Sequence, residues 1–147
     1  MPSSDLLGIY CMVIRAAVEY CSVVYHSLIP RYMAERLERV QVQAMKIIFG
    51  RGMDYGKMVE DGKIETLEKR RLAACRRFAT KAAASGRFGT KWFPRNGTER
   101  TVRSTTRKEY VERNCRTERG RNNPIQYMIR MLNEEDSKCS LVSVTNM

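Results

Sequence analysis

The chain has few of the side chains on which enzymes and metal sites depend. Its 147 residues include one histidine, His26, and four aspartates, none of them next to another. Its five cysteines are scattered, and no two have the short spacing of a zinc site. It also lacks a Ser/His/Asp set, a phosphate-binding loop and a dinucleotide-binding fingerprint. These absences predict a chain with no catalytic residue, no metal ion and no cofactor.

Targeting and membrane-spanning segments are missing from the sequence as well. The first residues, Met1–Asp5, lack the positive charge of a signal peptide. The apolar stretch from Leu6 to Ile29 is interrupted by Arg15 and Glu19, so we expect no helix that spans a membrane. An odd number of scattered cysteines is typical of reduced thiols. Together these features predict an intracellular protein.

What the chain has in excess is positive charge. It holds 27 Lys and Arg against 16 Asp and Glu, a net charge of +11. Residues 1–50 carry +1, residues 51–121 carry +11 and residues 122–147 carry −1. The excess is deepest over Lys69–Arg121, with 17 basic and 4 acidic side chains. This balance predicts a polyanionic partner, most often nucleic acid, with an acidic membrane surface or a solvated surface without a partner as alternatives.

The spacing of apolar residues predicts an all-α fold, a small bundle of three to four helices. Good capping residues, Asp54 and Thr66 among them, precede the apolar stretches, and Gly50 and Gly62 follow them. The predicted helices run over residues 4–25, 30–50, 54–61 and 66–85. The second is expected to bury a seam at 4-3-4-3 spacing, made of Met33, Leu37, Val40, Ala44 and Ile47.

The pattern predicts four consecutive parts. Residues 1–85 form the helical bundle, and residues 86–122 form a basic loop or disordered segment rich in Gly, Arg, Thr and Asn. Residues 123–133, opened by an Asn-Pro pair, form one short amphipathic helix. Residues 134–147 form a disordered tail.

Basic residues with interleaved aromatic side chains make the candidate nucleic-acid interface. On the fourth helix, Arg70, Arg77 and Lys81 share one face, which is suited to a phosphate backbone. Trp92 lies among arginines, where an indole stacks on unpaired bases or, alternatively, anchors the loop to the bundle. The candidate residues are Lys69, Arg70, Arg76, Arg77, Lys81, Lys91, Trp92, Arg103, Arg107, Lys108, Arg116, Arg119 and Arg121.

Short motifs occur in a characteristic order over Leu6 to Asn133. They include Val18-Glu19-Tyr20-Cys21, Lys46-Ile47-Ile48-Phe49-Gly50, Thr66-Leu67-Glu68-Lys69-Arg70-Arg71, Trp92-Phe93-Pro94 and Cys115-Arg116-Thr117-Glu118-Arg119. In order and spacing they resemble the region after the polymerase domain in reverse transcriptases of LINE-type (non-LTR) retrotransposons. Two departures are Ala16, where that family often has proline, and Tyr25, where it usually has tryptophan.

The resemblance implies a fragment of a reverse transcriptase that lacks the catalytic domain. Polymerases of that family hold Mg²⁺ ions on paired aspartates, and the segment that carries them would lie upstream of Met1. RNA or single-stranded DNA, and the polymerase domain of a longer protein, are the implied partners, and the nucleus is the implied compartment. Two alternatives stay open. One is a structural scaffold remnant that self-associates through exposed apolar helix faces, and the other is a repurposed small basic RNA-binding protein.

Overall fold

The computed structural model describes residues 2–86, 88–95 and 108–144, with side chains as far as residue 134. These residues form helices and no strand, apart from one isolated bridge between Arg95 and Tyr110, so the all-α prediction is confirmed. The chain divides into two compact units, Met1–Ala74 and Cys75–Met147, called here the N-terminal and the C-terminal unit. The division falls inside helix α6 (Leu67–Ala84).

The N-terminal unit begins with a helical segment that is broken where one helix was predicted. Its pieces are α1 (Ser3–Ile9), the π-helical turn η1 (Tyr10–Ile14), α2 (Arg15–Glu19) and α3 (Ser22–Tyr25). The break lies at Cys21, whose φ of 53° is left-handed. The Tyr25 hydroxyl donates to the carbonyl of Val18 at 2.6 Å, which satisfies one acceptor near the end of α2.

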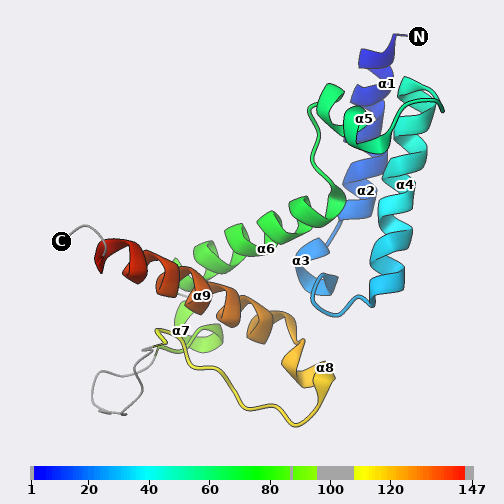
Figure 1. Ribbon diagram of the computed structural model, residues 1–147. Helices are drawn as coiled ribbons and strands as arrows, with labels where there is room; N and C mark the ends of the chain where they lie inside the picture. The colour runs from blue at the N-terminus through cyan, green and yellow to red at the C-terminus, as the bar shows by residue number, and fades with distance from the viewer. Residues whose placement is uncertain (1, 87, 96–107, 145–147) are drawn as a thin grey trace. The chain divides into compact units, whose positions relative to one another are not determined.

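Helix α4 (Arg31–Phe49) runs alongside α1 and α2, and α5 (Tyr55–Asp61) lies near the end of α4 (Figure 1). The Ser3 hydroxyl donates to the carbonyl of Ile48 at 3.4 Å, which ties the start of α1 to the end of α4. The predicted caps are confirmed: Asp54 accepts from the Gly56 N–H at 3.0 Å, and Thr66 accepts from the Lys69 N–H at 3.4 Å. Local capping chemistry therefore sets where α5 and α6 begin.

The predicted buried seam of α4 is confirmed at Ala44, but the other buried positions lie about one residue from the predicted ones. The buried positions are Gln41, Ala44, Met45 and Ile48, whereas Ile47 is 75% exposed. Both sets have helical spacing, so periodicity alone does not choose between them. The polar side chain of Gln41 is buried because it forms three hydrogen bonds in the interior. The buried face of α4 is therefore the one that contains Gln41.

The C-terminal unit holds the end of α6, the short helices α7 (Gly89–Trp92) and α8 (Glu118–Arg121), and the long helix α9 (Pro124–Val144). Its buried apolar side chains come from four stretches of the chain. They are Cys75, Ala79, Ala82, Phe93, Tyr110, Met128, Ile129, Met131 and Leu132.

A polar clamp holds the chain around Tyr110 to helix α9. The buried side chain of Asn133 accepts from the Tyr110 N–H at 2.9 Å and donates to the Tyr110 carbonyl at 3.1 Å. The Asn133 amide thus makes the same two hydrogen bonds to the Tyr110 backbone that a residue of a neighbouring β-strand would make. Phe93 packs edge-to-face on Tyr110 with ring centroids 6.4 Å apart. The described residues on either side of the undescribed stretch 96–107 are thereby joined.

The described residues of the segment 86–122 are mainly loop, with the two four-residue helices α7 and α8 and the Arg95–Tyr110 bridge within it. The end of α9 differs from the sequence prediction. Helix α9 starts beside Asn123 as predicted but continues to Val144 instead of ending at residue 133. The polar stretch after Asn133 contains neither glycine nor proline, so no helix breaker follows Pro124. Residues 145–147 of the predicted tail lie outside the described residues.

Candidate nucleic-acid interface

Positive charge is concentrated in one of the two units. The N-terminal unit has 11 basic and 9 acidic side chains, a net charge of +2, and the C-terminal unit has 16 and 7, a net charge of +9. Together they make the chain total of +11. A polyanion would therefore be attracted chiefly to the C-terminal unit.

The structure separates the basic residues that were predicted on the fourth helix. Arg70 is paired with Glu19 through two contacts, one of them from its Nη2 to Oε2 at 2.9 Å. This hydrogen bonding raises the pKa of the Arg70 guanidinium, and the pair lies inside the N-terminal unit. Lys69 is exposed in the same unit. Arg70 is thus a structural residue, and its prediction as a nucleic-acid contact is not supported by the geometry.

The other predicted residues of α6 lie in the C-terminal unit. Arg76, Arg77 and Lys81 all have exposed side chains on this helix. Arg77 and Lys81 are four residues apart, so they lie on one face of α6, about one turn apart. No described residue forms an ion pair with either side chain. Both remain available to bind an external anion.

The predicted cations around α8 also differ in what they contact. Arg116 and Arg119 are exposed and have no acidic partner among the described residues. Arg121 donates to the Cys115 carbonyl at 3.3 Å, and Lys108 is paired with Glu112 at 2.8 Å. The bond from Lys108 is the main cause of the lowered pKa of the Glu112 carboxyl. Arg121 and Lys108 therefore help to hold the local fold.

Two predicted residues, Arg103 and Arg107, lie outside the described residues. Three further side chains that sequence reasoning missed are close to the predicted ones, namely Arg113, Asn123 and Gln126. Arg113 belonged to the same basic segment and was identifiable from charge alone. Neither amide is recognisable as a site residue from the sequence. Asn123 stands before Pro124 and is read first as a helix cap, and Gln126 is read as a surface residue of the helix that follows.

Trp92 was predicted either to anchor the chain or to stack on bases. Its indole lies on the Phe88 ring with centroids 4.7 Å apart and an angle of 27° between the planes. The side chain is nevertheless only half-buried, and it lines a cavity with a volume of about 440 Å³. Trp92 is therefore anchored by Phe88 and accessible from that cavity at the same time.

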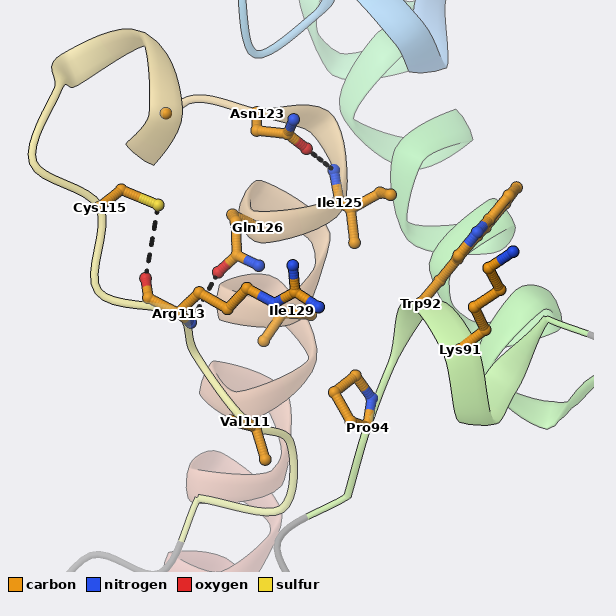
Figure 2. A pocket seen from close by; sticks show the side chains of 11 residues that line it. Lys91, Trp92, Pro94, Val111, Arg113, Cys115, Asn123, Ile125, Gln126 and Ile129 are labelled. Atoms are coloured by element: carbon orange, nitrogen blue, oxygen red, sulfur yellow. Dashed lines mark hydrogen bonds between the residues drawn. The ribbon is translucent and has the colours of Figure 1, made fainter.

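The cavity is formed entirely by the C-terminal unit (Figure 2). Lys91, Trp92 and Pro94 contribute one side, and residues of α9 such as Ile125 contribute another. Eleven residues line it: Lys91, Trp92, Pro94, Val111, Arg113, Cys115, Gly120, Asn123, Ile125, Gln126 and Ile129. The lining holds two cations and no carboxylate, so the cavity favours a ligand with negative charge or hydrogen-bond acceptors.

The N-terminal unit contains a largely buried polar network. Tyr10 donates to Gln41 Oε1 at 2.8 Å, and Gln41 Nε2 donates to the Tyr55 hydroxyl at 3.0 Å and to the Glu65 carbonyl at 3.1 Å. Tyr55 in turn donates to Glu38 at 2.8 Å. Burial raises the pKa of Tyr10 to about 12 and also raises the pKa of Tyr55. Both phenols therefore stay protonated near neutral pH, and their hydroxyls act as hydrogen-bond donors that fix the packing.

Further observations narrow the chemistry of the described part of the chain. Its histidine, cysteine and acidic residues form no group of three that could hold a metal ion. None of its helices combines the length and apolar character needed to cross a bilayer. Searches against family models, curated proteins and solved structures found no match. The features that point to a function are the positive charge of the C-terminal unit, its exposed cations and the geometry of its cavity.

Proposed function

We propose that the chain binds RNA or single-stranded DNA through its C-terminal unit, without reading base sequence and without catalysis. The observation that carries the proposal is a set of exposed cations that no acidic side chain among the described residues neutralises. They are called here the open cations and are Arg77, Lys81, Lys91, Arg113, Arg116 and Arg119. Six such charges in a unit of net charge +9 would displace counterions from a phosphate backbone.

Single strands are favoured over duplexes by the aromatic group beside these cations. A half-buried indole in an accessible cavity stacks on an unpaired base, which a duplex does not present. We infer that the chain is the non-catalytic, post-polymerase part of a retrotransposon reverse transcriptase, in which this unit would hold the template or the new strand.

The test is RNA binding by the full chain over a salt series. A variant with Arg77, Lys81, Arg116 and Arg119 changed to Gln removes four open cations. A control variant with Arg36, Arg39, Lys46 and Lys57 changed to Gln removes four exposed cations from the N-terminal unit. We expect wild type and control to bind a 20-nucleotide single strand alike. The first variant should lose most of its affinity, and its log–log salt slope should fall by roughly 3, since each contact contributes about 0.7.

Equal losses in the two variants would mean that only net charge matters, and no binding at low salt would overturn the proposal. Both outcomes are distinguishable from misfolding, because each variant can be compared with wild type by circular dichroism.

A second candidate function is a protein-packing role for the N-terminal unit. Of the fourteen large hydrophobic side chains that are exposed in the described residues, twelve lie in this unit, and examples are Met12 at 73%, Tyr20 at 77% and Ile47 at 75%. Such surfaces are typical of contacts with another protein. We propose the polymerase domain of a longer protein as the neighbour, with self-association as the result when that neighbour is absent. Analytical sedimentation at increasing protein concentration tests this. A chain that stays monomeric up to about 100 μM, well above the dissociation constant of a stable dimer, would argue against it.

A further inference from the structure

The cavity of the C-terminal unit has the size of a small-molecule site. Its volume of about 440 Å³ lies within the range of about 300–1,000 Å³ that is usual for ligand pockets. All of its lining residues belong to one compact unit. The site is therefore built by local packing of α7, α8, α9 and the chain around Arg113.

Flat apolar groups form two sides of this cavity. Figure 2 shows the Trp92 indole with Pro94 below it on one side, and Ile125 at the start of α9 facing them across the opening. Phe88 holds the indole in place at 4.7 Å. Since the ring is already ordered, little further side-chain entropy is lost when a planar ligand stacks on it.

The polar groups of the cavity are hydrogen-bond donors. Gln126 Oε1 accepts from the Arg113 N–H at 2.9 Å, and Asn123 Oδ1 accepts from the Ile125 N–H at 3.0 Å. These bonds occupy the oxygen of each amide and leave its NH₂ group without an acceptor among the described residues. The side chains of Lys91 and Arg113 add charged donors. A ligand that fits must combine a planar ring, acceptor oxygens or nitrogens, and negative charge.

We propose that this cavity binds one unpaired nucleotide of a single strand, with its base on Trp92 and its phosphate near Lys91 and Arg113. This inference rests on the proposed function and adds the place at which a base enters the protein. Base carbonyls and ring nitrogens accept from the NH₂ group of Gln126, and every base offers such acceptors. The cavity therefore selects unpaired over paired nucleotides and does not read sequence.

Trp92 is the only tryptophan of the chain, so its fluorescence reports on this cavity alone. We expect an eight-nucleotide oligouridylate to quench the fluorescence on binding to the full chain. A blunt-ended duplex of equal charge, which has no unpaired nucleotide, should bind without quenching. Inorganic polyphosphate with the same number of phosphates should compete for the cations and also leave the fluorescence unchanged, which distinguishes a bound base from a bound free phosphate.

A matched pair of variants locates the contact. Gln126→Glu keeps the oxygen that accepts from Arg113 but replaces the NH₂ donor with a carboxylate oxygen. Asn114→Asp makes the same change of charge at an exposed residue that does not line the cavity. We expect Gln126→Glu to abolish quenching and to weaken oligouridylate binding roughly tenfold, because the base loses a hydrogen-bond donor and meets a carboxylate oxygen instead. Asn114→Asp should change the binding less than about twofold.

The two proposals fail in different ways. If the chain binds single strands with a steep salt dependence, but Trp92 is not quenched and the two variants behave alike, the nucleotide site is wrong and the cationic interface stands. If oligouridylate, duplex and polyphosphate all fail to bind at low salt, the proposed function itself is wrong. Quenching by the duplex as strongly as by the single strand would also overturn the nucleotide site.

Discussion

The two units of this chain use polar and apolar groups in opposite ways. The N-terminal unit, of net charge +2, holds a buried glutamine, a buried tyrosine and a partly buried tyrosine in a hydrogen-bond network and exposes large apolar side chains. The C-terminal unit, of net charge +9, has a mainly apolar interior and exposes cations around a donor-lined cavity. An apolar surface suits a protein neighbour, whereas a cationic one suits a polyanion. This contrast is the basis for proposing that protein contact and nucleic-acid contact are divided between the units.

The largest expected effect tests whether the two units are independent. Met45 is 0% exposed in the N-terminal unit, so Met45→Ala should lower the free energy of unfolding of that unit by about 2–5 kcal/mol. Trp92 lies in the other unit, so its fluorescence transition in urea should not move, while the helical signal in circular dichroism shifts to lower urea. The matched change Ile129→Ala, at a residue that is 1% exposed, should shift the fluorescence transition instead. Coincident shifts in both probes would show one cooperative unit.

The next effect concerns the polar interior of the N-terminal unit. Gln41→Leu leaves the Tyr10 hydroxyl and the Glu65 carbonyl without the bonds that Gln41 makes to them, while the Tyr55 hydroxyl keeps only its bond to Glu38. We expect the free energy of unfolding to fall by about 1–3 kcal/mol, the usual effect of unpaired buried polar groups. Gln43→Leu, at an exposed position of the same helix, should change it by less than about 0.5 kcal/mol. Similar effects from both changes, measured by urea unfolding, would show that the network adds no stability.

Much of the secondary structure was predictable because its signals are local. Asp54, Thr66 and the Asn123-Pro124 pair cap helices through bonds to residues two or three positions away, and each helix begins where they indicate. The break at Cys21 is different, since a non-glycine residue in a left-handed conformation has no such signal.

The candidate site was only partly predictable, because its contacts join residues that are far apart in the chain. Arg70 and Arg77 look alike in the sequence, but Glu19, 51 residues away from Arg70, neutralises the first and leaves the second open. Gln126 reads as a surface residue of an amphipathic helix until the chain near Arg113 is placed beside it. Composition predicted which unit is basic, and only packing shows which cations remain available.

A smaller expected effect is the pH dependence of the stability that Tyr10 gives to the N-terminal unit. Burial raises the pKa of Tyr10 from 10.0 to about 12, so the folded state holds the phenol proton more tightly than the unfolded chain does. The resulting stability is complete below pH 10 and is lost as the pH rises towards 12. We expect Tyr10→Phe to be less stable than wild type at pH 8, and the difference in unfolding free energy to shrink from pH 10 to pH 12. A difference that stays constant with pH would contradict the assignment.

The smallest effects come from two adjacent arginines of α6. Arg70 is paired with Glu19, and both side chains are partly shielded, with 30% and 21% of their surfaces exposed. Arg71 is only 2% exposed, and its Nε and Nη1 have no hydrogen-bond partner among the described residues. Burial lowers the pKa of the neighbouring His26, and the Arg71 charge adds to that shift. The Arg70 guanidinium is thus paired with a carboxylate. The Arg71 guanidinium is buried and forms no ion pair with an acidic side chain among the described residues.

Removing these two charges should therefore act in opposite directions. Arg70→Met leaves Glu19 unpaired and should lower the free energy of unfolding by roughly 1 kcal/mol. Arg71→Met keeps an unbranched apolar side chain in place and removes a poorly compensated charge, so stability should stay the same or rise by about 1 kcal/mol. Neither change should weaken RNA binding, because both guanidinium groups are engaged or buried within the N-terminal unit. A loss of several kcal/mol in Arg71→Met would reveal an acceptor for its guanidinium, and weaker RNA binding in either variant would place part of the interface in the N-terminal unit.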